Sequence, residues 1–123
     1  MSKPRSKLTD YKTREFREVR GFTTAIHFGK QEKHLPGRPG YDPSKSSMSI
    51  GIREIQRLVE DKAGTGRWEG ANKEVIDFGV EIGVHRTREP GSGLPTTRGT
   101  IHYSKTGAHI VPAVPTVIVG RDK

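Results

Sequence analysis

The sequence predicts an α+β fold in which a small, mostly antiparallel sheet carries one main helix packed on it. Several short stretches are rich in β-branched and aromatic residues and are separated by glycine- and proline-containing segments, as is typical of strands joined by turns. One stretch, residues 50–62, instead has apolar residues at the spacing of a helix face. With 123 residues, of which 30% are hydrophobic, the chain can bury one modest core.

The N-terminal region, residues 1–21, is strongly charged and is predicted to be a basic arm or a short helix ahead of a folded domain at 22–123. Tyr11, Phe16 and Val19 are spaced roughly as on one helix face, so residues 10–19 can form a helix; a solvated arm fits equally well. The β-branched and aromatic stretch 22–28 is expected to be a strand. A lysine-rich segment follows, and then a stiff loop, because prolines fix the backbone of residues 36–43.

Residues 50–62 form the main predicted helix. Its apolar residues recur at helical spacing while charged residues occupy the other positions. The stripe consists of Ile52, Ile55, Leu58 and Val59. Serines within residues 47–49 can cap the N-terminus, and Gly64 fits the C-terminal end. We expect the stripe to pack on the sheet.

The C-terminal half is predicted to be mostly strands. Strands are expected at 73–78 and 81–86, a hairpin at 97–112 and an edge strand at 117–119, with loops at 64–70 and 87–96. The hairpin carries most of the candidate chemistry. Strand residues alternate between faces, so the polar, even-numbered residues 98–104 should share one face, with Ile101 and Tyr103 on the other.

The length of the hairpin turn decides which histidines meet. A two-residue turn, Lys105-Thr106, pairs His102 with His109 on one face of the sheet. A three-residue turn with Gly107 in a bulge pairs Tyr103 with His109 and separates the histidines. We favour the two-residue turn because it keeps polar side chains on one face and apolar ones on the other.

The charge of the chain limits its partners. Its formal net charge is +8, which favours association with polyanions: nucleic acid first, then an acidic protein, then an anionic membrane surface. The chain has no cysteine, which excludes disulfides and thiolate metal sites. No apolar run is long enough for a membrane span, and no hydrophobic stretch follows the basic start, so no signal peptide is predicted.

The histidines and lysines suit phosphodiester chemistry without a metal. The sequence has no metal-binding motif, no phosphate-binding glycine loop followed by lysine, and no nucleophile elbow. RNA cleavage can use the substrate's own 2′-hydroxyl, so the protein needs only a base, an acid and cations. The alternative for each residue is an ordinary surface side chain. The candidates are His34, His102 and His109 with Lys30, Lys33, Arg98, Ser104 and Lys105.

Several blocks of the sequence resemble the polymorphic toxin type 50 domain. The blocks are Gly29 to Gly37, Tyr41, Ser46, Ala63 to Gly66, Asn72 to Phe78, Ile82-Gly83, Thr96 to Lys105, and His109 to Pro112. They cover about residues 26–115 in unbroken order. Two departures are visible: Arg38-Pro39-Gly40 stands where the family often has two asparagines, and Lys45 where it often has arginine. Lysine keeps the charge but loses bidentate geometry.

The resemblance implies a ribonuclease of the barnase/EndoU/colicin/RelE-like fold, with an active site on the open face of the sheet. It implies delivery into the cytoplasm of a rival cell as the C-terminal part of a larger toxin, and a cognate, acidic immunity protein. The family's shared polar positions correspond here to Lys30, Gln31, His34, Ser46, Thr65, His102, Ser104, Lys105 and His109.

These observations predict a metal-independent endoribonuclease, with tRNA as one candidate substrate and no cofactor. His34 and His102 are assigned to the two proton transfers in either order, with His109 in reserve. Ser104 and Lys105 complete the predicted catalytic set. Predicted phosphate or substrate contacts are Lys30, Gln31, Lys33, Lys45, Ser46, Thr65, Thr97 and Arg98. The candidates for stacking against a base are Tyr41, Trp68 and Tyr103. The alternatives are a non-catalytic, basic nucleic-acid-binding module of prophage origin and a transferase.

Overall fold

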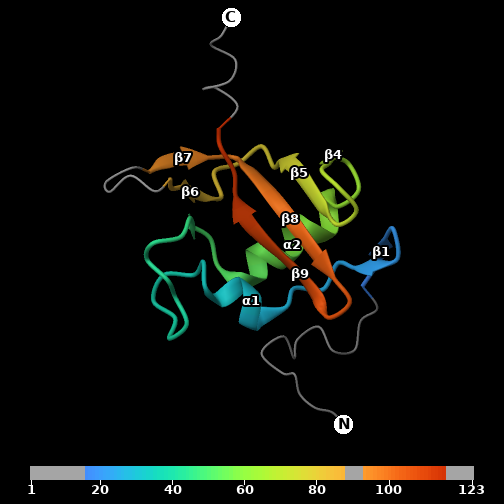
Figure 1. Cartoon of the computed structure of the whole chain (residues 1–123), viewed down its shortest axis with the longest axis horizontal. Coiled ribbons are helices and arrows are strands. Elements are labelled where there is room, and N and C mark those ends of the chain that lie inside the picture. The colour runs from blue at the N-terminus through green and yellow to red at the C-terminus, as the bar shows by residue number, and fades with distance from the viewer. Residues whose placement is uncertain (1–15, 88–92, 116–123) are drawn as a thin grey trace, which may run out of the picture.

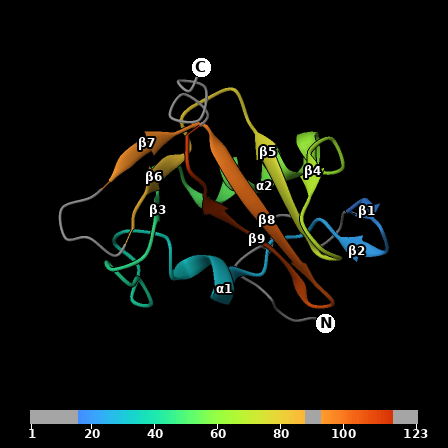
Figure 2. The same ribbon diagram turned by 45° about the horizontal axis from the view of Figure 1, so that its top comes forward.

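The structure, a computed structural model of the chain, describes residues 16–87 and 93–115. A long hairpin lies at the centre, with one long helix behind it and a short helix beside it (Figures 1 and 2). The described elements are β1 (Glu18–Val19), β2 (Phe22–Thr23), α1 (Phe28–Glu32), β3 (Ser47–Met48), α2 (Ile52–Lys62), β4 (Arg67–Trp68), β5 (Lys73–Asp77), β6 (Gly83–His85), β7 (Leu94–Thr96), β8 (Arg98–Ser104) and β9 (Gly107–Pro112).

Antiparallel pairing arranges these strands into three sheets. The largest has the order β4-β5-β8-β9, a second has the order β3-β6-β7, and β1 pairs with β2 alone. Ile26 adds a parallel bridge to Ala108 at the outer edge of the largest sheet. The predicted α+β class, a small antiparallel sheet set with one main helix, is therefore confirmed.

The core lies between α2 and the four-stranded sheet. Ile55 and Val59 of the helix are fully buried and belong to the same cluster as Ile101 and Ile110 of the hairpin. Burying a side chain of this size stabilises a fold by about 1.5–3 kcal/mol. Because residues alternate along each strand, the polar residues of the hairpin lie on the sheet face turned away from α2.

Helix α1 is held against β9 by a buried glutamine. The Gln31 side chain accepts a hydrogen bond from Ile110 N at 2.8 Å and donates one to Ile110 O at 2.9 Å, in place of a neighbouring strand. The N-terminus of α1 is capped by His27, whose Nδ1 accepts from Lys30 N at 3.2 Å. These contacts set the position of Lys30 and of the chain that follows α1.

A buried carboxylate anchors the loop after α2 to the sheet. Glu74 of β5 is fully buried and accepts hydrogen bonds from the backbone N–H groups of Gly64 and Gly66. The Tyr103 hydroxyl donates to the same carboxylate at 2.7 Å. Burial, with the carboxylate beside it, raises the pKa of Tyr103, so its proton stays in that bond. Gly64, which was predicted only to end the helix, and Gly66 of the predicted loop thus both hold this carboxylate through their N–H groups.

Several local predictions are wrong. The predicted strand at 22–28 is a strand only at 22–23. Its last residue, Phe28, begins α1, which continues into the lysine-rich segment where no helix was expected. The serines at 47–49 do not cap α2: Ser47 and Met48 form β3, and Gly51 is the N-cap without a side-chain hydrogen bond. Short strands also stand within both predicted loops, β4 in 64–70 and β7 in 87–96.

Other predictions are confirmed or lie outside the described residues. Helix 50–62 corresponds to α2, and Gly64 follows its end with a φ of +95°. Strands 73–78 and 81–86 correspond to β5 and β6. Of the helix considered for 10–19, residues 18–19 form β1 instead, while 10–15 and the edge strand at 117–119 lie outside the described residues. No helix of the described part is long and apolar enough to cross a membrane.

Candidate active site

A cleft of about 410 Å³ opens on the polar side of the hairpin, between the hairpin, α1 and the loop that leads to β3. Figure 2 shows α1 lying beside β9 at this side of the sheet. The residues that line the cleft are Lys30, Lys33, His34, Lys45, Asn72, His102, Tyr103, Ser104 and His109. They come from segments as much as 79 positions apart, from 30 to 109.

The register of the hairpin brings two of the histidines together. His102 faces His109 and Ser104 faces Gly107, so the turn has two residues, as predicted. Gly107 has a φ of +138°, and a Cβ there would lie 2.9 Å from the His27 side chain and 3.0 Å from Ala25 O. The glycine is therefore required because residues 25–27 pass close to it, and not because the turn contains a bulge.

Three imidazoles form a stack in this cleft. The rings of His102 and His109 are 4.9 Å apart between centroids, and those of His34 and His109 are 6.0 Å apart. The interplanar angles are 20° and 16°, so His109 stacks with both of the others. Among the described residues, no group of three or more His, Cys, Asp or Glu side chains is arranged to hold a metal ion.

His34 is held in one tautomer. It is buried, and its Nδ1 lies 2.8 Å from the carbonyl oxygen of Ser46. Because a carbonyl only accepts, Nδ1 carries the hydrogen, and Nε2 of the neutral ring is left as the acceptor. Burial lowers the pKa of His34 below its ordinary 6.5, although the bond to Ser46 opposes the shift. The ring is therefore neutral at pH 7.

The other two imidazoles also favour the neutral form. Burial, followed by the nearby charge of Lys73, lowers the pKa of His102. Burial and the neighbouring His102 lower the pKa of His109 to about 3. The Nδ1 atom of His109 is buried and has no hydrogen-bond partner among the residues that the structure describes. A buried ring without a partner strongly resists taking up a proton, so a bound anion would be needed to charge this stack.

Lysine side chains border the stack on the side of α1. The Lys30 ammonium group donates to Ser104 Oγ at 3.1 Å, and that hydroxyl donates onward to Gly107 O at 2.8 Å. Ser104 therefore orients Lys30 across 74 positions of sequence. Lys33 and Lys45 are exposed at the rim of the cleft. None of the three forms an ion pair within the described part of the chain.

The model of the family described as bacterial toxin 50 matches residues 26–112, which include the whole cleft. This chain belongs to the bacterial toxin 50 family. No curated protein is significantly similar to it. The match confirms the resemblance to a polymorphic toxin domain and supports a toxin role for the chain.

Two predicted contact residues of the toxin domain are buried parts of the framework instead. Gln31 is fully buried, and both ends of its amide bond the backbone of Ile110. Ser46 is buried, its Oγ accepts from Arg86 N at 2.9 Å, and its carbonyl holds His34. Both therefore act on the cleft through other residues and do not line it.

Four further predicted residues lie away from the cleft lining. Thr65 follows α2, and its hydroxyl donates to the carbonyl of Lys62 at 2.7 Å. Arg98 stands at the far end of β8, four residues or about 13 Å from His102. The carbonyl of its neighbour Thr97 accepts a hydrogen bond from the N–H of Phe78, the residue after β5. Lys105 is exposed in the turn, one residue beyond Ser104.

One residue of the cleft lining, and one beside it in the sheet, were not selected by sequence reasoning. Asn72 lies at the rim, and its side chain donates to Tyr103 O at 3.0 Å. Lys73 faces His102 across the β5–β8 ladder. The alternation along β5 could have indicated this position of Lys73. Glu74, Ile76 and Phe78 lie on the core side, so Lys73 is assigned to the other face.

The aromatic residues considered for base stacking have other surroundings. The Tyr103 ring is buried on the core side and stacks against Trp68 and Phe22, with centroids 5.3 and 5.7 Å away. The guanidinium of Arg20 covers the Trp68 ring at 3.9 Å. Tyr103 therefore borders the cleft with its backbone and not with its ring.

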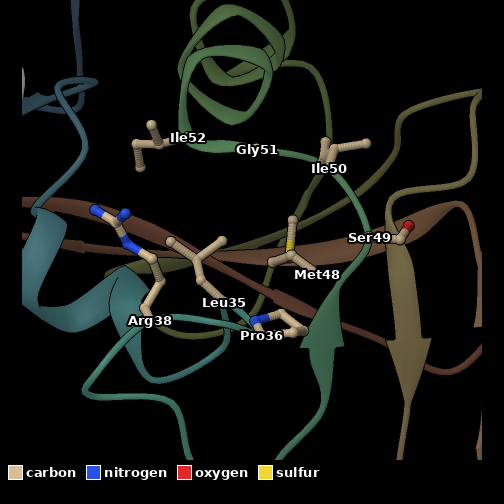
Figure 3. A pocket seen from close by; sticks show the side chains of 8 residues that line it. All are labelled: Leu35, Pro36, Arg38, Met48, Ser49, Ile50, Gly51 and Ile52. Atoms are coloured by element: carbon tan, nitrogen blue, oxygen red, sulfur yellow. The ribbon is translucent and has the colours of Figure 1, made fainter.

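A second cavity, of about 460 Å³, lies at the N-terminus of α2 and has a different character. Figure 3 shows its lining, in which Leu35, Pro36 and Met48 gather below Ile52, and Arg38 stands at one side. Leu35 and Met48 adjoin His34 and β3 along the chain. The cavity has no histidine or carboxylate in its lining, so it offers apolar contact rather than proton transfer.

Proposed function

We propose that this toxin domain is a metal-independent endoribonuclease that cleaves RNA through the substrate's own 2′-hydroxyl. The observation that carries the proposal is the stack of His34, His109 and His102 in one cleft, bordered by lysines that form no ion pair within the described part of the chain. Such cleavage needs a base for the 2′-hydroxyl proton, an acid for the leaving oxygen, and positive charge for the phosphorane.

His34 is the base in this proposal. Its Nδ1 hydrogen is committed to Ser46 O, so the free Nε2 can accept the proton of the 2′-hydroxyl. A lowered pKa keeps that nitrogen unprotonated at neutral pH. The 2′-oxygen then attacks phosphorus, the bond from phosphorus to the 5′-oxygen breaks, and a 2′,3′-cyclic phosphate forms.

His102 is the acid. It lies beyond His109 in the stack and is more exposed than His34. Burial, followed by the charge of Lys73, lowers the pKa of His102 in the free protein. A bound phosphate would offset that positive charge and favour the imidazolium, which gives its proton to the departing 5′-oxygen. Hydrolysis of the cyclic phosphate by the reverse proton roles would regenerate both rings.

Lys30, Lys33 and Lys45 supply the positive charge. Lys30 is already oriented by Ser104, and the other two stand at the rim, where they meet an incoming phosphate. His109, with a pKa of about 3, stays neutral and separates the two proton-transfer groups. We assign it to positioning both neighbours rather than to proton transfer.

The proposed biological setting follows from the family and the charge. We propose that the domain acts in the cytoplasm of a rival cell after delivery as part of a larger toxin, with RNA, tRNA among the candidates, as its target. A net charge of +8 suits both an RNA substrate and an acidic immunity protein in the producing cell.

Incubation of the protein with total RNA in EDTA tests the activity. The wild type should release fragments ending in 2′,3′-cyclic phosphate, and His34→Ala and His102→Ala should each lower the rate by about 10²–10⁴-fold. His85→Ala is the matched control, because this partly buried histidine of β6 lies outside the cleft. Intact RNA at high protein excess, with the fold confirmed, would favour the non-catalytic binding module instead.

A further inference from the structure

The row of side chains that contains the histidines continues beyond them. Lys73 of β5 is the ladder partner of His102, which is itself the partner of His109. Directly opposed residues in a sheet share a face, so the three side chains project on the same side. The cleft on that side is bordered by lysines at its α1 end. Lys73 is not part of the cleft lining, but it follows Asn72 of that lining and adds a cation on the β5 side of His102.

The ammonium group of Lys73 has no partner that would neutralise it. The residue is exposed and forms no ion pair within the described part of the chain. Glu69, whose N–H donates to the carbonyl of Lys73, has its carboxylate bonded to Arg67 at 3.0 Å. Glu74, the next residue of the strand, is turned into the core and bound there by Gly64, Gly66 and Tyr103. Lys73 is thus available to an anionic ligand.

We infer that Lys73, with Asn72 beside it at the rim, forms a subsite for a second phosphate of the same RNA strand, next to the phosphate that is cleaved. This inference rests on the proposed function for the identity of the first phosphate. Two strand spacings, about 10 Å, separate β9 from β5, a distance that a neighbouring phosphate can reach. The substrate strand would then cross the sheet over the histidine stack, from the lysines near α1 towards β5.

Kinetics on short substrates test the subsite. A dinucleoside monophosphate presents only the scissile phosphate, whereas the same dinucleotide with an added 5′- or 3′-phosphate can also occupy the second position. We expect the wild type to cleave one phosphorylated form with a higher kcat/KM than the plain form. Lys73→Ala should bring that ratio close to one, and Lys73→Arg should restore it.

The ratio is compared within each variant, since Lys73 also affects the pKa of His102 and that effect is common to both substrates. Lys62→Ala is the matched control, because this exposed lysine ends the helix on the other side of the sheet. An unchanged ratio in Lys73→Ala, or equal losses on both substrates, would overturn the subsite while leaving the nuclease proposal standing.

Binding of a 2′-deoxy oligonucleotide separates the two proposals, because it cannot be cleaved by this route. For single strands the logarithm of affinity falls with the logarithm of salt by about 0.7 for each phosphate contact. Lys73→Ala should reduce that slope by about 0.7, and Lys62→Ala should not change it. If this slope changes as expected while RNA stays intact, the nuclease proposal fails, and Lys73 is still shown to contact a phosphate of the bound strand. If the slope is unchanged, or the wild type does not bind, the subsite is refuted.

Discussion

Lowering the pH from 8 to 5 should destabilise the protein through His109. In the unfolded chain this histidine has a pKa near 6.5, whereas burial and the neighbouring imidazole lower the pKa in the folded state to about 3. Between these values the unfolded state binds a proton that the folded state does not. The stabilising contribution is therefore complete above pH 6.5 and is lost as the pH falls towards 3.

The size of the effect follows from the same two values. If the whole difference between the folded and unfolded pKa values of His109 applies, the free energy of unfolding is about 2 kcal/mol lower at pH 5 than at pH 8. Each unit of pKa difference corresponds to about 1.4 kcal/mol. The ring is partly exposed at the cleft, and screening by water brings the expected value to about 1–2 kcal/mol.

Urea unfolding at the two pH values measures this contribution, with the fluorescence of the single tryptophan, Trp68, as the signal. Groups that titrate elsewhere act equally in wild type and variant, so the comparison is with His109→Asn. The wild type should lose about 1–2 kcal/mol more than this variant between pH 8 and 5. His85→Asn, outside the stack, should behave like the wild type. Equal losses in wild type and His109→Asn would refute the reasoning.

Three further predictions concern the anchors of the site and its pH dependence. Glu74→Gln should lower the free energy of unfolding by about 2–3 kcal/mol in urea, because charged acceptors bind the loop N–H groups more strongly; a change below 0.5 kcal/mol would contradict this. Gln31→Leu should cost about 2–4 kcal/mol in the same assay by leaving the N–H and C=O of Ile110 unpaired, and an unchanged midpoint would disprove the clamp. Burial lowers the pKa of both His34 and His102, so kcat/KM for RNA cleavage should peak below pH 6.5, and a maximum above pH 7 would contradict the assigned roles.

The strongest periodic signals in the sequence predicted their elements well. The four apolar residues of the stripe fixed α2, because a helix with one apolar face has one way to bury it. The alternation of the hairpin predicted its two faces and favoured the observed register over that of a three-residue turn, since a shift by one residue would have placed His102 or Ile101 on the wrong side. Short elements were missed where tertiary contacts decide them: α1 is only five residues long and depends on His27 and on the clamp to Ile110.

The candidate site, like the fold, was determined partly by the sequence and partly by tertiary contacts. The sequence by itself determined which groups are available: histidines for proton transfer, lysines for phosphate, and a hairpin with one polar face. It could not determine that Gln31 and Ser46 support the cleft while Lys73 stands beside His102, because a polar side chain is equally suited to a ligand or to a backbone partner. Only the tertiary structure brought His34 onto His109, since α1 docks on β9 across 79 positions of sequence, and burial there sets the pKa of the stack.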